Sequence, residues 1–198
     1  MSVNRHNYSD HELVETTISS DTVLQGGMML VKRDQVLLPS GNQGQREYVI
    51  HPGALVVIPM LSDGNFLFER QFRYPLKNVF IEFPAGKIDL DEDILHAGQR
   101  ELLEETGYTA QSWTYLGLQH PCIGYSDEVI HMYLAQDLTL GEPKRDEDEA
   151  LQLFEMTMTQ GLVAIASGEI TDAKTIVALV WAEKYLQGLW KPSINESA

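Results

Sequence analysis

The chain has 198 residues, 43% of them hydrophobic, which is enough for one domain with a full core and a small appendage. Its net charge of −15 repels phosphate backbones, so we expect no nucleic-acid partner. No apolar run approaches the ~18 residues that cross a membrane, and the polar N-terminus is not a signal peptide. The single cysteine, Cys122, suits a reducing compartment, so we expect a cytoplasmic protein without a membrane partner.

Residues 1–45 form a distinct first part of the chain. Leu24 to Leu38 carries apolar residues around Gly26-Gly27, interrupted by the polar run 32–35. This pattern predicts a two-stranded antiparallel hairpin with its turn at 32–35, followed by a loop at 40–44. A hairpin alone is marginally stable, so we expect this small sheet to lean on the main domain or on a second subunit.

Residues 46–198 predict one further domain that mixes strands and helices. Alternating or short apolar runs predict strands at 54–58, 66–72, 79–83, 113–119, 129–135 and 151–156. Apolar residues at helical spacing predict helices at 94–106, 159–167 and 172–187. The order of these elements favours an α/β sandwich with a mixed sheet over a doubly wound βαβ fold.

Three glutamates share the helix predicted at 94–106. Residues three or four apart are neighbours on a helix, so Glu101 lies beside both Glu104 and Glu105. Each like-charge pair costs roughly 0.2–0.5 kcal/mol, and the C-terminal half of a helix disfavours anions. A divalent cation would remove this conflict, and Mg²⁺ prefers carboxylate oxygens. The alternative is a solvated acidic face with Leu102 and Leu103 turned to the core.

The spacing of the fixed residues favours the metal-binding interpretation. The chain reads Gly, five residues, Glu, seven residues, Arg-Glu, an apolar residue, any residue, Glu-Glu, any residue, Gly and an apolar residue. These positions are Gly86, Glu92, Arg100, Glu101, Leu102, Glu104, Glu105, Gly107 and Tyr108. This run, called the box below, resembles the signature of Nudix hydrolases, and the resemblance covers most of residues 46–190. It implies an α/β/α sandwich and hydrolysis of a nucleoside diphosphate linked to another group.

The resemblance also implies a role for each charged residue of the box. Glu101 and Glu105 would be the main ligands of Mg²⁺, or of Mn²⁺ as the alternative, together with the backbone carbonyl of Ala85. Glu104 would hold a further metal ion or a ligating water. Arg100 would orient the glutamates through charge-assisted hydrogen bonds.

The segment before the box narrows the substrate. Residues 81–87, preceded by 70–74, resemble the ADP-ribose pyrophosphatase branch of the family. By that likeness Arg46 and Arg73 would hold substrate phosphates or the terminal ribose; their alternative is a surface salt bridge. Glu82 would contact a metal ion or the substrate, with capping of a strand as its alternative.

A second acidic segment follows at residues 141–149. In the same branch the corresponding loop carries the catalytic base, and its position implies Glu147 as the base with Glu149 close to a metal ion. An ordinary charged loop is the alternative. One departure concerns a proline that the branch has downstream of the box: here that position is Ile123, and Pro121 lies two residues earlier.

The expected reaction is therefore hydrolysis of ADP-ribose to AMP and ribose 5-phosphate. Another nucleotide sugar such as GDP-mannose remains an alternative, because of the departure at Ile123. The rival from another class is an ADP-ribose sensor without activity, although such sensors often lose box glutamates that this chain keeps. In similar enzymes an N-terminal sheet exchanges between two subunits, so the resemblance implies a homodimer.

Overall fold

The computed structural model describes residues 10–141 and 150–191, which form two compact units. The N-terminal unit contains the described residues up to His51 together with Cys122–Asp127. The main unit contains Pro52–Pro121 and the described residues from Glu128 onward. No helix within these described ranges has both the length and the apolar character of a membrane span.

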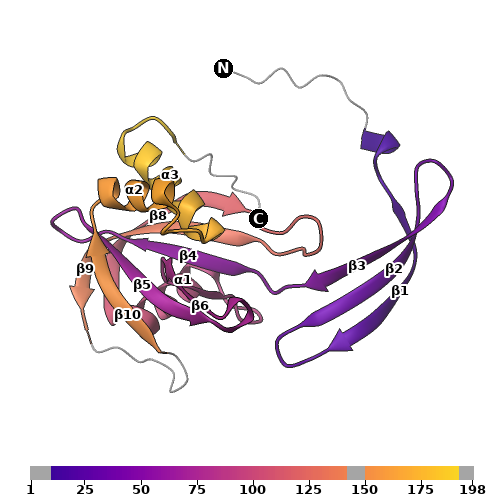
Figure 1. Ribbon diagram of the computed structural model, residues 1–198, viewed down its shortest axis with the longest axis horizontal. Helices are drawn as coiled ribbons and strands as arrows, with labels where there is room; N and C mark the ends of the chain where they lie inside the picture. Colours follow the sequence, from indigo (N-terminus) through magenta and orange to yellow (C-terminus); the bar gives the residue numbers. More distant parts are fainter. Residues whose placement is uncertain (1–9, 142–149, 192–198) are drawn as a thin grey trace. The chain divides into compact units, whose positions relative to one another are not determined.

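The N-terminal unit is built on a three-stranded antiparallel sheet in the order β1-β2-β3 (Figure 1). Its strands are β1 (Thr16–Gln25), β2 (Leu30–Leu37) and β3 (Gln43–Ile50). The prediction of a turn at 32–35 is wrong, since these residues lie inside β2. The chain reverses at the glycine pair instead, where the Gly26 N–H donates to the Met29 carbonyl at 2.8 Å.

This sheet buries little apolar surface. Every residue of β1 is exposed, including Ile18 and Val23. Among the described residues of the unit, Val36 is the one large apolar side chain that is buried. Three strands need a hydrophobic face or a packing partner for independent stability, and this unit has exposed apolar side chains where a partner could lie.

Two sheets form the centre of the main unit. The mixed sheet has the order β7-β4-β9-β8, in which β4 and β9 are parallel and the other neighbours antiparallel. The second, antiparallel sheet has the order β10-β5-β6. The strands are β4 (Ala54–Pro59), β5 (Phe66–Arg73), β6 (Asn78–Glu82), β7 (Ala85–Lys87), β8 (Tyr108–Gln119), β9 (Ile130–Leu140) and β10 (Leu151–Met156).

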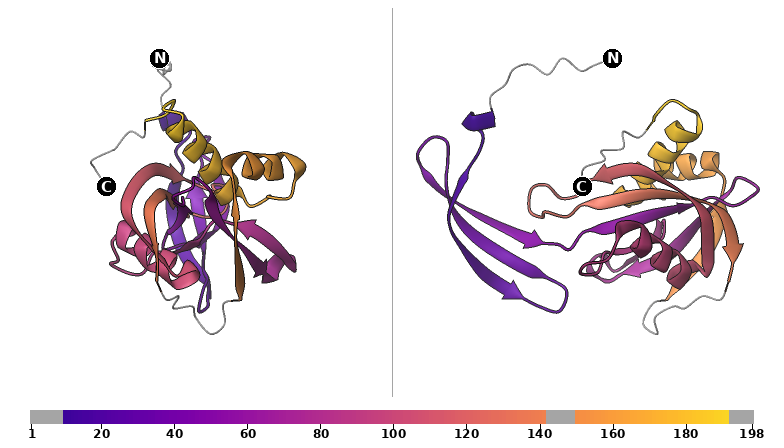
Figure 2. Two further views of the ribbon diagram at one scale, coloured as in Figure 1. Left: turned by 90° about the vertical axis from the view of Figure 1, so that its left-hand side faces the viewer. Right: turned by 180° about the vertical axis from the view of Figure 1, so that it is seen from behind.

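Three helices pack on these sheets, as Figure 2 shows from two sides. They are α1 (Ile94–Glu101), α2 (Met158–Ser167) and α3 (Ala173–Leu186). Successive side chains of a strand point to opposite faces, so β4 serves two cores. Leu55 and Val57 pack with α1, whereas Val56 and Ile58 belong to the larger core that α2 and α3 cover. The α/β class with a mixed sheet is confirmed.

The helix expected at 94–106 ends at Gly107, as its sequence indicates, but its last part is not α-helical. Residues Leu102–Thr106 form a π-helical turn, and Gly107 follows in the left-handed conformation with φ 78°. Short π-helical turns are frequent at functional sites, where they change the direction of side chains relative to a regular helix.

One buried hydroxyl joins α3 to the strand that precedes the box. Thr175, fully buried, accepts a hydrogen bond from the backbone N–H of Phe83 at 2.9 Å. The same hydroxyl donates to the carboxylate of Asp172 at 2.7 Å, and Asp172 is the N-cap of α3. The start of α3 is therefore held against the end of β6.

We expect Thr175→Val to lower the free energy of unfolding by about 1–3 kcal/mol, because it leaves the buried Phe83 N–H without its acceptor. Thr175→Ser is the control, since it keeps the hydroxyl and loses one methyl group, worth about 0.8 kcal/mol. Urea denaturation measures both. Equal stability of the valine and serine variants would contradict this role of the hydroxyl.

Candidate active site

The first glycine of the box lies where β7 meets the helix that carries the glutamates. A Cβ atom placed on Gly86 would lie 1.9 Å from both Cδ and Oε1 of Glu101. The Glu101 carboxylate therefore sits directly over the Gly86 backbone, and its side chain is 13% exposed. A residue with a side chain at position 86 would have to displace this carboxylate.

Arg100 connects most of the acidic residues of the box. Its Nε and Nη2 donate to the two oxygens of Glu92 at 3.0 and 2.9 Å. Its Nη1 donates to Glu101 at 2.7 Å and to Glu104 at 3.1 Å, and Nη2 also donates to the Lys87 carbonyl at 3.1 Å. These contacts use all five N–H groups of the guanidinium. One cation thus compensates three carboxylates and ties them to β7.

Glu92 accepts hydrogen bonds from two nitrogens of Arg100. Hydrogen bonds from Arg100 lower the pKa of Glu92 to about 2, against the opposing effect of its removal from water. The Asp89 backbone N–H and the His96 ring add contacts at 3.1 Å each. The pKa of Arg100 is raised in turn, first by its hydrogen bond to Glu92. Both groups are charged at neutral pH.

The last two glutamates of the box point in different directions. Glu105 is 3% exposed, and its Oε2 accepts a hydrogen bond from the Ala85 backbone N–H at 3.1 Å. The side chain of Glu104 is 37% exposed and contacts Arg100. The expected crowding of three carboxylates is relieved because Glu105 turns to β7 while Glu101 and Glu104 share Arg100.

Two carboxylates consequently converge on the same short stretch of backbone. Glu105 contacts Ala85, and Glu101 covers Gly86. Within residues 10–141 and 150–191, no three His, Cys, Asp or Glu side chains are grouped to hold a metal ion. Mg²⁺ nevertheless binds through one or two carboxylates plus water and substrate phosphates, so Glu101, Glu105 and the Ala85 carbonyl fit its donor set. Glu147 and Glu149 lie outside the described residues.

A second charged cluster lies between the end of β5, the end of β6 and the start of α3. Arg73 holds both oxygens of Glu82 in a bidentate pair, at 2.8 and 2.7 Å. Lys174 contacts the same Glu82 carboxylate and also donates to Asp172 at 3.0 Å. Lys174 was missed by the sequence reasoning, because it is 92 residues away from Glu82 and only the fold brings the two together.

Arg73 also links this cluster to the box. Its hydrogen bond to Glu82 raises the pKa of Arg73 and burial opposes this, while the charges of Glu69 and Glu105 add to the increase. Glu69, which the sequence reasoning also missed, is buried in β5 directly opposite Glu82 in β6. Arg73 is thus within electrostatic reach of the carboxylate that faces Ala85.

Arg46 belongs to the N-terminal unit and is described within it. Its Nε donates to Glu15 at 2.9 Å, and its Nη2 contacts the second oxygen of the same carboxylate. The pKa of Arg46 is raised by this hydrogen bond. In this structure Arg46 therefore forms the surface salt bridge that the sequence left open as its alternative.

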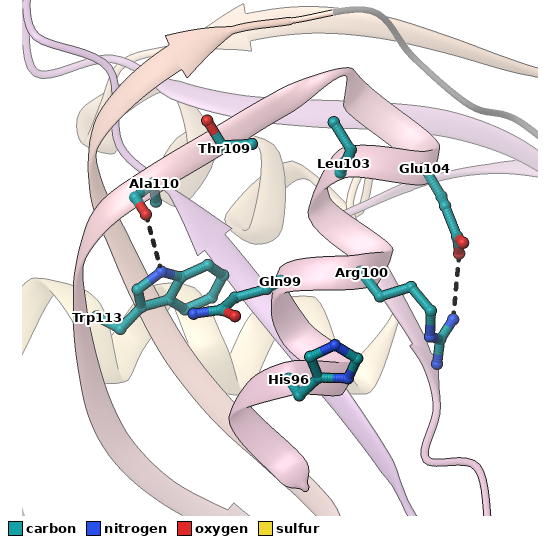
Figure 3. Close-up of a pocket in the computed structure, with 8 residues that line it drawn as sticks. All are labelled: His96, Gln99, Arg100, Leu103, Glu104, Thr109, Ala110 and Trp113. Carbon is teal, nitrogen blue, oxygen red and sulfur yellow. Dashed lines mark hydrogen bonds and ion pairs between the residues drawn. The ribbon is translucent and has the colours of Figure 1, made fainter. Parts of the chain in front are cut away.

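A groove of about 550 Å³ runs along another face of α1 (Figure 3). It is lined by His96, Gln99, Arg100, Leu103 and Glu104 of the helix and by Trp113 of β8, among others. Figure 3 shows the ion pair between Arg100 and Glu104 at one side of the groove and the Trp113 indole at the other. Glu101 and Glu105 point toward β7 instead, so the groove and the two converging carboxylates lie on different faces of the helix.

Replacing Glu92 with Gln removes the charge that Arg100 holds. The folded pKa of about 2 lies below the ~4.3 of an unfolded glutamate, so the stabilisation is complete above about pH 5 and is lost as the pH falls toward 2. We expect the difference in Tm between wild type and Glu92→Gln to be constant from pH 7 to about pH 5, and to narrow below ~4.3.

The control for this titration is Glu169→Gln, at an exposed glutamate that follows α2. It should leave Tm nearly unchanged across the same pH range. A difference for Glu92→Gln that stays constant down to pH 3 would show that Arg100 does not stabilise the ionised carboxylate.

Comparisons with known proteins agree with this geometry. The family model described as NUDIX domain matches residues 49–179. The ADP-ribose pyrophosphatase of Bacillus subtilis (strain 168) is 38% identical over 177 residues, which cover 88% of this chain and 94% of the relative. The methanol dehydrogenase activator of Bacillus methanolicus is 37% identical over 175 residues, covering 87% and 92%.

A solved structure agrees with the fold in particular. The crystal structure of an ADP compounds hydrolase superposes with a TM-score of 0.80 at 22% identity, covering 88% of this chain and 95% of the other. The family match spans the box, and the relatives are similar over nearly their whole lengths. The chain therefore belongs to the Nudix hydrolase family.

Proposed function

We propose that the protein hydrolyses ADP-ribose to AMP and ribose 5-phosphate with Mg²⁺. The observation that carries this proposal is the convergence of Glu101 and Glu105 on Ala85–Gly86, with Arg73 within electrostatic reach of Glu105. An acidic pair next to an arginine suits a metal-bridged diphosphate. The similarity to an ADP-ribose pyrophosphatase over 94% of that protein supports the choice of substrate.

The chain's own residues have separate tasks in this reaction. Bound Mg²⁺ would supply charge neutralisation at the phosphates and an activated water. Arg100 donates hydrogen bonds to Glu101 and Glu104 and so positions both carboxylates. Glu104 would bind a further metal ion or a ligating water. We assign Arg73, which is paired with Glu82 in this structure, to the substrate phosphates or the terminal ribose. The same role for Arg46 rests on sequence likeness alone, because Arg46 pairs with Glu15 here.

The proton of the attacking water goes to a general base, which we assign to Glu147, with Glu149 close to a metal ion. Both assignments rest on sequence position alone, since the two residues lie outside the described part of the chain. Replacement of each residue by Gln tests which one is the base. We expect Glu147→Gln to reduce kcat strongly, and a kcat near that of the wild type would contradict the assignment.

The first test is a hydrolysis panel with Mg²⁺ that contains ADP-ribose, GDP-mannose, NADH, FAD and 8-oxo-dGTP. We expect ADP-ribose to be cleaved fastest, and Glu105→Gln to reduce kcat by about 100-fold or more, because it removes a charged ligand at the reacting phosphate. The matched control is Glu169→Gln. Chelation of the metal should abolish turnover of the wild type.

The panel also separates the competing functions. Preferential cleavage of GDP-mannose would replace ADP-ribose by another nucleotide sugar and keep the reaction. Tight binding of ADP-ribose without hydrolysis would make the protein a sensor.

A second candidate is support of a dehydrogenase, suggested by the 37% identity to a methanol dehydrogenase activator. The wild type and Glu105→Gln would each be added to an assay of methanol dehydrogenase. A higher rate of the dehydrogenase in the presence of the wild type would support this second function.

We also propose that the protein is a cytoplasmic homodimer. A single cysteine suits a reducing compartment. The N-terminal sheet exposes a group of large apolar side chains, with relative exposures of 52% for Ile18, 49% for Leu24 and 70% for Met28. A three-stranded sheet with so little buried apolar surface needs a packing partner for its stability. A second copy of the sheet would supply the missing packing partner.

Light scattering coupled to size exclusion tests this assembly. We expect the mass of two chains for the wild type, and a shift toward one chain for Ile18→Ser with Leu24→Ser, because polar side chains reduce the apolar area that the interface buries. The control is Val163→Ser, at an exposed apolar residue of α2 in the main unit. A wild type with the mass of one chain at micromolar concentration would contradict the dimer.

A further inference from the structure

Two cations share one buried carboxylate in the second charged cluster. The side chain of Glu82 is 2% exposed and accepts from both Arg73 and Lys174. Burial alone would raise the pKa of Glu82, but the hydrogen bonds and charges of these two residues outweigh it and the pKa is lowered. Glu82 is therefore a buried anion, and a buried anion needs a permanent counter-ion.

The two cations differ in how firmly they are held. The Lys174 side chain is 14% exposed and is also fixed by Asp172, the N-cap of α3. Asp172 is in turn bound by the backbone N–H and the hydroxyl of the fully buried Thr175. The Arg73 side chain is 40% exposed, and Glu82 is the one side chain to which it donates a hydrogen bond among the described residues.

The position of Lys174 is not one that stabilises helix α3. It lies in the first turn of α3, at the end where the helix dipole disfavours a cation. Arg73 and Lys174 are the two cations that contact Glu82, and the buried Glu69 lies opposite Glu82 in the neighbouring strand. If Arg73 turns toward a phosphate, Lys174 still compensates Glu82.

We propose that Lys174 is a positioning residue for substrate binding: it keeps Glu82 compensated, so that the Arg73 guanidinium is available to an anionic phosphate of the substrate. This inference rests on the proposed function for the identity of the substrate. Without Lys174, Arg73 is the one counter-ion that contacts Glu82 in the described part of the chain, and it stays bound to it. Removal of Lys174 should therefore weaken substrate binding more than it slows the reaction.

The test compares Lys174→Met, Lys174→Arg and Lys184→Met. Lys184 is the matched control, because it lies on the same helix and pairs with its neighbour Glu183 at 2.8 Å. We expect Lys174→Met to raise KM for ADP-ribose about tenfold with kcat within about twofold, as for the loss of one charged hydrogen bond. Lys174→Arg should restore KM, and Lys184→Met should leave both constants unchanged.

A double-mutant cycle distinguishes this role from a purely structural one. In a Glu82→Gln background Lys174 has no charge at position 82 to compensate, so adding Lys174→Met should change KM less than about twofold. The double variant also removes both charges together, which keeps the test possible if the single variant does not fold. Additive effects of the two substitutions on KM, or a loss of Tm without a change in KM, would overturn the inference.

Binding of a non-cleavable probe separates this inference from the proposed reaction. The probe is the methylene analogue of ADP-ribose, in which CH₂ replaces the oxygen between the two phosphates, and its Kd is measured by calorimetry with Mg²⁺. We expect Lys174→Met to raise this Kd about tenfold. Wild type that binds the probe but does not cleave ADP-ribose overturns only the proposed function. Equal Kd values for wild type and Lys174→Met overturn only the role of Lys174.

Discussion

The guanidinium of Arg100 compensates most of the negative charge that gathers on the acidic helix of this protein. Three carboxylates within reach of one another would repel, and Glu92 would add a fourth at the start of the helix. Arg100 places its planar guanidinium among Glu92, Glu101 and Glu104 and uses every N–H group it has. Lysine could not make the same set of contacts. The remaining glutamate, Glu105, turns to β7, where its carboxylate accepts a hydrogen bond from the Ala85 N–H.

Much of the fold could be predicted from short-range patterns. The apolar run 54–58 became β4, and the left-handed Gly107 ends the helix that begins after Asp93. Other predictions failed, beginning with the N-terminal hairpin of two strands, which is a sheet of three. The polar run 32–35 indicated a turn, yet it lies inside β2, and the chain reverses between Gly26 and Met29 instead. The π-helical turn at Leu102–Thr106 has no sequence signal in a segment with regular helical spacing.

The candidate site also contains residues that the sequence identifies and residues that only the fold brings together. The residues of the box stand close together in the sequence, so their spacing was sufficient to identify them. Lys174 could not be found, because its partner Glu82 lies in a strand 92 residues earlier and a lysine near a helix start carries no signal of its own. Glu69 was overlooked for a related reason: its position opposite Glu82 depends on the pairing register of β5 and β6.

The close approach of Gly86 and Glu101 has a consequence for how this protein can vary. The carboxylate occupies the space that any Cβ at position 86 would need, so a larger residue at position 86 pushes the flexible end of Glu101 away from the backbone it covers. Replacement of Glu101 beside Gly86 creates no such clash, because the glycine carries no Cβ. The two positions are therefore unequal. The glutamate can be shortened alone, whereas the glycine cannot be enlarged without moving the glutamate.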